Sequence, residues 1–291
     1  MLNISKKVLF NCASIKVPIV DVKAFLTEGP SSKSDCKEVT EALVKYGCLI
    51  IKDPRVNQAQ NDKFLDMMEK YFSKRGEDFY KTKQAKDIYP EHSFQVGATP
   101  EFTEKARDHS DLCKIYSNEN SPLTPMPPPF DAKWRYFWDI STGDQYKPRY
   151  ENPAPADFPE FSDVMNTWGR HMINGCYTVA QMAAIGMGLE KETFTSMMNG
   201  GQHKLAPTAS DLRKFDVSTV FAGFHYDFNF LTIHGKSRYP GLFAWLRTGE
   251  KFTVAVPEGH LLLQAGKQFE WLTGGYINCG FHEVMYTEKV K

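Results

Sequence analysis

Helical periodicity is the first pattern along this chain. Apolar residues recur every three or four positions over residues 34–46, 61–74 and 161–200, with polar residues between them. The pair Gly200-Gly201 follows the last run, and glycine commonly ends a helix. We therefore predict amphipathic helices, of which residues 161–200 form the longest and brace one face of a sheet. Its stripe of methionines is typical of a packed core rather than of a cofactor site.

Short runs of β-branched and aromatic residues indicate strands in other segments. Residues 17–21 and 48–51 predict two strands near the N-terminus, and residues 276–279 predict one near the C-terminus. Residues 219–233 predict a longer strand. Between residues 81 and 160 prolines interrupt every pattern, so we expect loops that wrap a core and contact a substrate.

The composition narrows the class of protein. The chain has 291 residues, with 35 lysines and arginines against 35 aspartates and glutamates. This balanced charge disfavours nucleic acid and anionic membranes as partners. No apolar run approaches the roughly twenty residues of a membrane span, and the N-terminus does not read as a signal peptide. Six cysteines without a CxxC pair read as reduced thiols, so we expect a cytoplasmic protein, and a monomer.

Two histidines and one aspartate carry the chemistry that this sequence predicts. His225 and Asp227 lie two positions apart in the run 219–233, so on one strand both side chains point the same way. His282 follows the run 276–279, and a rolled antiparallel sheet can bring it beside them. Two imidazoles and one carboxylate hold a non-haem Fe(II) and leave other coordination positions open. We predict that these three residues bind iron and that no further catalytic residue is needed.

Two alternatives compete with this site. His109 and Asp111 form a second His-x-Asp pair, with His171 as its third ligand. However, the segment before His109 is charged, and His171 falls within the predicted long helix. The first site could instead bind zinc and catalyse hydrolysis, which needs a general base. Glu283 is the candidate base, although next to His282 on a strand it would face the opposite side.

Further motifs surround the three predicted ligands. Leu231-Thr232 follows the His-x-Asp pair, Pro240-Gly241-Leu242 comes next, and nine residues separate Gly266 from Gly275, with seven more to His282. This arrangement resembles the isopenicillin N synthase-like branch of the 2-oxoglutarate/Fe(II) dioxygenases. The resemblance implies Fe(II), with 2-oxoglutarate and O2 as co-substrates. It also implies an oxidation of an unactivated C–H bond in a small molecule by hydroxylation, desaturation or ring closure.

The resemblance also implies the fold. It is mainly β with flanking helices: a double-stranded β-helix, or jelly roll of the cupin-like type, with N-terminal helices and one long bracing helix. We expect residues 1–291 to form a single catalytic domain. Residues 1–160 would be its helical and irregular portion, residues 161–200 the long helix, and residues 201–291 the jelly-roll core with the metal site.

The chain departs from the family pattern where 2-oxoglutarate binds. Lys204-Leu205-Ala206-Pro207 stands in place of an Asn-Tyr-Tyr-Pro motif, and the C-terminal Arg-x-Ser that anchors the far carboxylate is absent. We expect either that the sequence stops short of its natural C-terminus, or that Arg238, Lys236 or Lys291 takes the anchoring role. Thr232 is a further candidate for co-substrate binding. Without co-substrate, the chain would be a catalytically degenerate jelly-roll binding protein.

Two residues are candidates for substrate binding. Arg135 lies within the aromatic run Trp134-Arg135-Tyr136-Phe137-Trp138, and it either reaches solvent from a packed strand or binds a substrate carboxylate. His234 follows the metal motif closely enough to line the pocket. We expect a small-molecule substrate, with carboxylate-bearing metabolites as the first class to test, and no nucleic acid or membrane partner.

Overall fold

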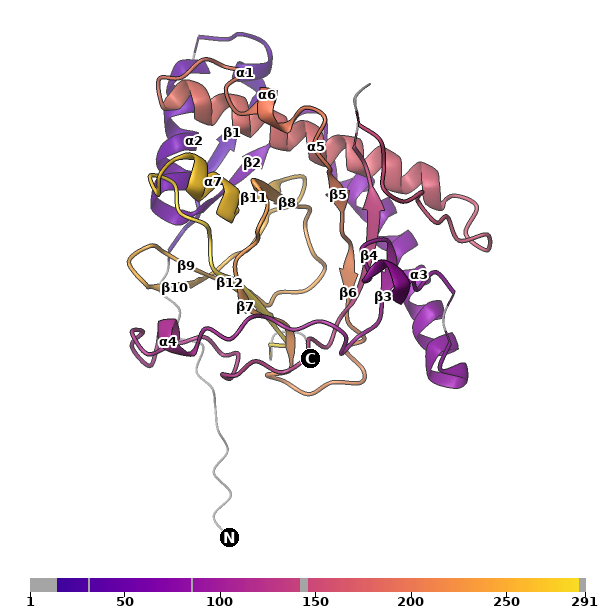
Figure 1. Cartoon of the computed structure of the whole chain (residues 1–291). Coiled ribbons are helices and arrows are strands. Elements are labelled where there is room, and N and C mark those ends of the chain that lie inside the picture. The colour runs from indigo at the N-terminus through magenta and orange to yellow at the C-terminus, as the bar shows by residue number, and fades with distance from the viewer. Residues whose placement is uncertain (1–14, 31, 85, 142–145, 288–291) are drawn as a thin grey trace.

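Helices lie on more than one side of the sheets in this computed structural model: Figure 1 shows α5 above them and α4 below. The structure describes residues 15–30, 32–84, 86–141 and 146–287. Its helices are α1 (Lys23–Leu26), α2 (Ser32–Tyr46), α3 (Gln58–Thr82), α4 (Ser110–Cys113), α5 (Phe161–Gly186), α6 (Thr195–Met198) and α7 (Lys267–Leu272), with one 3-10 turn, η1 (Pro90–His92). Helices α2 and α3 confirm the predicted helices near the N-terminus.

Three sheets make up the β structure of the described residues. The first has the order β1 (Ile19–Asp21), β2 (Cys48–Lys52), β11 (Leu261–Ala265), β8 (Leu231–His234). The second has the order β10 (Lys251–Thr253), β9 (Leu242–Trp245), β12 (His282–Met285), β7 (Val220–His225). The third contains β3 (Gly97–Thr99), β4 (Trp134–Asp139) and β5 (Lys204–Leu205), and β6 (Thr208–Ala209) also pairs with β4.

The first and second sheets face each other and enclose apolar side chains. Ile50 and Leu262 of the first sheet form one buried cluster with Ala244 and Phe252 of the second. Figure 1 shows the second sheet beneath the first. Within each of these two sheets, most neighbouring strands are distant in sequence, as in a rolled sheet. The predicted jelly-roll core is therefore confirmed.

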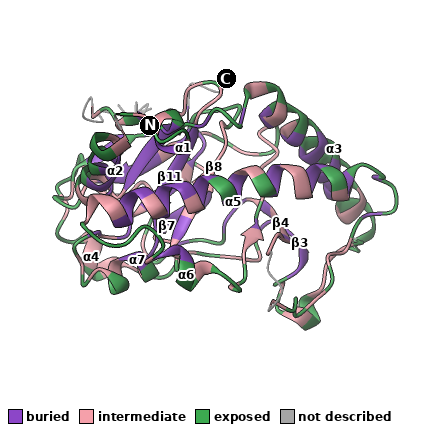
Figure 2. Cartoon of the chain, turned by 90° about the horizontal axis from the view of Figure 1, so that it is seen from above, coloured by how far each residue is buried: buried purple, intermediate pink, exposed green. Residues whose placement is uncertain are grey.

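Helix α5 lies across the outer face of the first sheet, as Figure 2 shows from above. Gly175 marks the contact, because a Cβ at this position would lie 2.6 Å from Ile233 on β8 and 3.8 Å from Ile51 on β2 and Leu261 on β11. A methyl group there would have to displace the Ile233 side chain, so the glycine helps the helix to lie close to the strands. The expectation of one long helix that braces the sheet is confirmed.

The predicted end of this helix is wrong. The expected helix over residues 161–200 stops at Gly186, and residues up to Met198 form turns and the short helix α6. The cause is Gly188, whose φ of +76° is left-handed and ends the helix. The Leu189 N–H then bonds the Ala184 carbonyl at 2.9 Å, which satisfies a carbonyl of the last turn.

The strand predicted over residues 219–233 is in fact two strands in different sheets. β7 ends at His225, and β8 starts at Leu231. Between them the chain crosses from the second sheet to the first, and its backbone bonds the start of α7 instead of a strand: Lys267 N–H donates to Asp227 O at 2.8 Å. Asp227 therefore lies just beyond β7, not on it.

Residues 276–279 do not form the predicted strand. Their N–H groups bond side chains of the preceding turn: Ile277 N–H donates to Thr273 Oγ1 at 3.1 Å, and Cys279 N–H donates to Glu270 Oε2 at 2.9 Å. These partners replace a strand ladder. The segment is an ordered connection that leads from α7 into β12.

One large apolar core joins the N-terminal helices to the C-terminal strands. It extends from Val20 through the residues of α5 to Ile277. Every cysteine in the described residues is free, which agrees with the expected reduced thiols, whereas Cys12 lies outside them. None of the described helices is both long and apolar enough to cross a membrane.

Candidate metal centre

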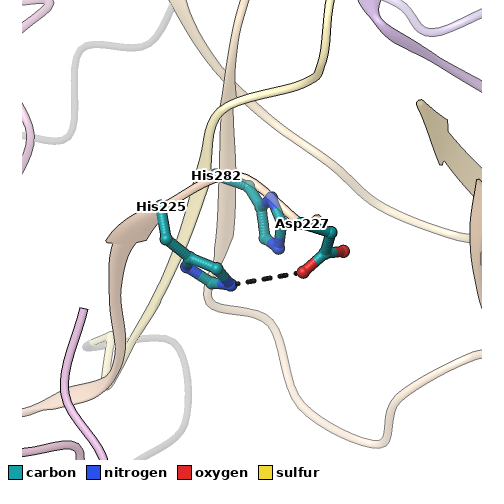
Figure 3. Close-up of side chains that lie close together, drawn as sticks. All are labelled: His225, Asp227 and His282. Atoms are coloured by element: carbon teal, nitrogen blue, oxygen red, sulfur yellow. Dashed lines mark ion pairs between the residues drawn. The ribbon is translucent and has the colours of Figure 1, made fainter. Parts of the chain in front are cut away.

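His225, Asp227 and His282 converge at the facing ends of β7 and β12. His282 pairs directly with His225 across the two antiparallel strands. The ligand atoms of the three side chains lie within 4.8 Å of one another, and no other such group occurs among the described residues. Figure 3 shows the side chains turned toward one another, with 3.7 Å between His225 Nε2 and Asp227 Oδ1. Strand pairing thus assembles the predicted triad.

Backbone carbonyls fix the orientation of both imidazole rings. His225 Nδ1 lies 2.5 Å from Gly223 O, and His282 Nδ1 lies 3.2 Å from Gly280 O. A carbonyl oxygen only accepts hydrogen bonds, so each Nδ1 carries the proton. Each Nε2 then keeps its lone pair for a metal ion, which is the arrangement that metal-binding histidines require.

The electrostatics of the triad favour a divalent cation. Burial lowers the pKa of His282 to about 4, and it also lowers the pKa of His225, against the opposing charge of Asp227. Burial raises the pKa of Asp227, but the nearby charges of His282 and His225 outweigh it and the net shift is downward. At neutral pH the site therefore holds two neutral imidazoles and one carboxylate.

Thr232 contacts the carboxylate of Asp227, the predicted metal ligand, directly. Its hydroxyl donates to Asp227 Oδ2 at 2.5 Å and accepts from Asn229 Nδ2 at 2.8 Å. The sequence predicted Thr232 as a co-substrate ligand, and the structure places it where it orients Asp227. Asp227 Oδ1, the other carboxylate oxygen, is the one that faces His225.

His234 and Gln264 form a polar pair on the same strands. His234 Nε2 lies 2.9 Å from Gln264 Oε1. Burial lowers the pKa of His234, with a smaller lowering by His282 and an opposing effect of Asp227. That His234 lines the substrate pocket stays a prediction. The sequence reasoning missed Gln264, although a lone glutamine in the apolar run Leu261-Leu262-Leu263-Gln264-Ala265 was a usable signal.

The cations predicted to anchor 2-oxoglutarate lie in different surroundings. Arg238 forms ion pairs with Asp66 and Glu69, two exposed carboxylates on α3. Its guanidinium is thus directed to the surface of that helix. The backbone carbonyl of Lys236 accepts a hydrogen bond of 3.0 Å from Asn61 Nδ2. Lys291 lies outside the described residues.

Arg135 belongs to a partly buried charge cluster beside β7. The strand around it is confirmed as β4, with alternating buried positions. Its guanidinium is only partly exposed: it pairs with Glu104 and covers the Phe137 ring at 3.7 Å. Lys133 joins the cluster through Asp131 and lies 3.8 Å from Glu104. No sequence pattern had singled out Lys133 or Glu104.

The rival metal site does not form. His109 packs against the aromatic rings of Phe224 and Phe281, while Asp111 is almost fully exposed and pairs with a lysine. His171, on α5, bonds Gln60 at 2.9 Å. The three side chains therefore serve separate structural contacts, as the sequence context indicated.

Glu283 faces away from the triad, as predicted. Its buried carboxylate accepts hydrogen bonds from Leu123 N at 2.8 Å, from Thr124 N at 2.9 Å and from Thr124 Oγ1 at 2.6 Å. These bonds join β12 to the loop after α4 and use both carboxylate oxygens. Glu283 is therefore a structural residue and gives no general base to a zinc hydrolase.

The donor set fits Fe(II). Two imidazole nitrogens and one carboxylate oxygen on one face of a site are the ligands of non-haem Fe(II) oxygenases, and imidazole and carboxylate are both suited to this ion. Hydrogen bonds from Gly223 O, Gly280 O and Thr232 already hold the three ligands. A site so supported in the described chain needs little rearrangement to bind a metal.

Comparison with known proteins adds to this picture. No protein-family model matches the sequence, and neither does any curated protein. Among solved structures, a full-length Neurospora crassa protein in complex with alpha-KG matches with a TM-score of 0.71 and 19% identity, over 94% of this chain and 79% of the other. A 2OG-Fe(II) oxygenase family protein from Caulobacter crescentus has the same TM-score of 0.71 and 19% identity, over 94% and 81%.

A third similar structure comes from a plant. The dioxygenase for auxin oxidation 1 of Arabidopsis thaliana, in complex with 2-oxoglutarate, matches with a TM-score of 0.60 and 15% identity, over 94% of this chain and 88% of the other. The chain therefore has the fold of the 2-oxoglutarate/Fe(II) oxygenases. This confirms the fold that the motifs around His225 and His282 implied.

Proposed function

We propose that this protein is a 2-oxoglutarate/Fe(II)-dependent oxygenase. The observation that carries the proposal is the triad itself: two neutral imidazoles with free Nε2 atoms and one carboxylate, within 4.8 Å, on a jelly roll. His225, Asp227 and His282 would hold the iron. With 2-oxoglutarate and O2, the bound iron supplies the oxidising power needed to attack an unactivated C–H bond.

The chain's own residues would bind the iron, orient its ligands and exclude water from the site. Gly223 O and Gly280 O keep both rings in the metal-binding tautomer, and Thr232 holds the Asp227 carboxylate. The apolar cluster of Ile50, Leu262 and their neighbours fills the space between the two sheets. Three protein ligands leave the remaining coordination positions open for the co-substrate and O2. A catalytically degenerate binding protein would have no need of these open positions.

The substrate is proposed to be a small molecule. The similar Neurospora crassa protein has been solved with thymine as well as alpha-KG. The balanced charge of this chain suits a small ligand rather than a nucleic acid. Carboxylate-bearing metabolites remain the first class to screen, and we propose a cytoplasmic monomer formed of one catalytic domain.

An anaerobic Fe(II) titration tests the metal site. We expect one equivalent of Fe(II) to bind the wild type, and His225→Ala, Asp227→Ala and His282→Ala each to lose it. His109→Ala is the matched control, because it changes the rival histidine and should bind as the wild type does. Undiminished affinity in all three triad variants would refute the site. Oxygen-dependent conversion of 2-oxoglutarate to succinate by the loaded wild type then tests the reaction.

A further inference from the structure

The inner face of the first sheet carries a short polar row opposite the triad. The register of β8 and β11 places Gln264 beside Thr232, and Leu262 beside His234. Thr232 bonds Asp227, so its face of the sheet is the one that looks at the triad. Directly paired residues and residues two apart share a face. Gln264 and His234 therefore look into the same space as the metal ligands.

These two residues form a pair that is incomplete by itself. Gln264 Oε1 accepts from His234 Nε2 at 2.9 Å, whereas Gln264 Nε2 is buried and has no hydrogen-bond partner among the described residues. Gln264 is only 1% exposed. A buried polar group without a partner costs about 1–3 kcal/mol, so such pairs inside a core usually serve a ligand or a specific geometry.

The hydrogen bond also fixes which ring atom is left for a ligand. A glutamine oxygen only accepts, so His234 donates from Nε2, and Nδ1 is the remaining polar atom of the ring. A carboxylate ligand likewise only accepts. His234 can bridge Gln264 and a carboxylate when both ring nitrogens carry protons, and it then brings a positive charge to the ligand.

Three other cations of the chain already form ion pairs. Arg238 pairs with carboxylates of α3, Arg135 pairs with Glu104, and Lys133 pairs with Asp131. His234, which points into the same space as the triad, has no carboxylate partner in an ion pair within the described chain.

We infer that His234, held in place by Gln264, binds the far carboxylate of the 2-oxo acid whose other end lies at the metal. The inference rests on the proposed function and gives that site its co-substrate anchor. Asp227 and His282 are the titratable groups whose charges act on the His234 ring, the first favouring and the second opposing a second proton. The free ring is neutral because of burial, so one proton is taken up with the ligand.

Binding of two matched ligands to the anaerobic Fe(II) protein tests the inference. 2-Oxoglutarate and 2-oxovalerate share the metal-binding end and the chain length, and only the first has the far carboxylate. By calorimetry, the wild type should bind 2-oxoglutarate at least about 10-fold more tightly, as a charged hydrogen bond predicts. Repeating the titration in buffers of different ionisation enthalpy should show one proton taken up with 2-oxoglutarate and none with 2-oxovalerate.

Two variants of His234 remove the interaction in different ways. In His234→Leu the preference for 2-oxoglutarate should fall to within about 3-fold, with 2-oxovalerate bound as before. His234→Gln keeps a polar side chain of similar size, so it serves if the leucine variant does not fold. It should lower the preference and abolish proton uptake. His260→Gln changes a half-buried histidine whose Nδ1 bonds only the nearby Glu258 carbonyl, and it should behave as the wild type does.

The outcomes separate the inference from the proposed function. If the wild type binds neither 2-oxo acid, the proposed function is wrong. If the wild type binds both equally, or if both His234 variants keep the full preference for 2-oxoglutarate, another group holds the carboxylate and the inference is overturned. A lost preference with an unchanged Fe(II) titration supports the inference.

Discussion

The Thr232 hydroxyl donates a hydrogen bond of 2.5 Å to Asp227 Oδ2, although the chain passes from one sheet to the other between these two residues. Asp227 follows the end of β7 in the second sheet, and Thr232 is in β8 of the first. The bond therefore ties a metal ligand outside regular structure to a strand of the core. The bond holds the Asp227 side chain in place, which strand pairing would have done if Asp227 lay within β7.

Removing this bond should weaken metal binding. In Thr232→Val the Asp227 carboxylate loses its donor and its fixed direction, and we expect Fe(II) affinity to fall by about 10-fold or more. The shape of valine keeps the packing of β8. Anaerobic Fe(II) titration gives the affinity, and Thr193→Val, at an exposed turn, is the control. Equal affinity in Thr232→Val and the wild type would show that the hydroxyl does not orient the ligand.

The metal-free protein should lose stability as the pH falls below neutral. Burial lowers the pKa of His282 from 6.5 to about 4, so the unfolded chain binds a proton that the folded chain rejects. Stability is then full above the unfolded value and declines from about pH 6.5 toward pH 4, by up to about 3 kcal/mol from this residue. His225 and His234, whose pKa values are also lowered, act in the same direction.

Urea unfolding at several pH values measures this effect. The free energy of unfolding of the wild type should fall between pH 7.5 and pH 4.5. In His282→Gln the decline should be shallower, because one titrating group is gone. Other histidines with lowered pKa values, such as His109 and His203, contribute equally to both proteins and cancel in the comparison. Parallel curves for the two proteins would contradict the argument.

The triad could be predicted from the sequence because it depends on local spacing. His225 and Asp227 are two residues apart, and strand-forming neighbours precede the first. The partner His282 needed only a pairing of β12 with β7, which a rolled sheet supplies. The passage of the chain to the other sheet after His225 could not be predicted. The composition of residues 228–233 suits a strand in either sheet, and only contacts with α7 decide its path.

The pairing of His234 with Gln264 and the end of helix α5 could not be predicted from the sequence, for a different reason. His234 and Gln264 meet through the register of β8 with β11, which no local pattern encodes. Helix α5 ends at Gly186 although apolar residues continue at helical spacing toward Met198. There a single left-handed glycine, Gly188, outweighs the pattern. In each case a tertiary contact or one backbone angle decided the outcome.

Glu283 should contribute to stability and not to metal binding. In Glu283→Ala the N–H groups of Leu123 and Thr124 lose their buried acceptor, which should cost about 2–5 kcal/mol. Because this side chain faces away from the triad, Fe(II) affinity of the folded variant should stay within about 3-fold of the wild type. Urea unfolding and Fe(II) titration measure the two effects. Glu258→Ala, in an exposed turn, is the control, and a selective loss of metal affinity would count against the structural role.

Two helical glycines should respond in opposite ways to alanine. At Gly186 a Cβ would overlap Thr40 Oγ1 and the Cys36 carbonyl, because α2 and α5 touch at this point. The backbone carbonyl cannot move without shifting α2, so Gly186→Ala should destabilise the protein by about 1–3 kcal/mol.

At Gly76, in α3, the nearest atom to an added Cβ is Trp134 Nε1 at 4.0 Å. Alanine there meets no obstacle and restricts the unfolded chain, so Gly76→Ala should stabilise the protein by about 0.5–1 kcal/mol. Urea unfolding of both variants beside the wild type measures the signs. Both substitutions add the same methyl group inside a helix, so any difference between them reports the contact between helices. If both variants were stabilised, α2 and α5 could not be packed as closely as Gly186 indicates.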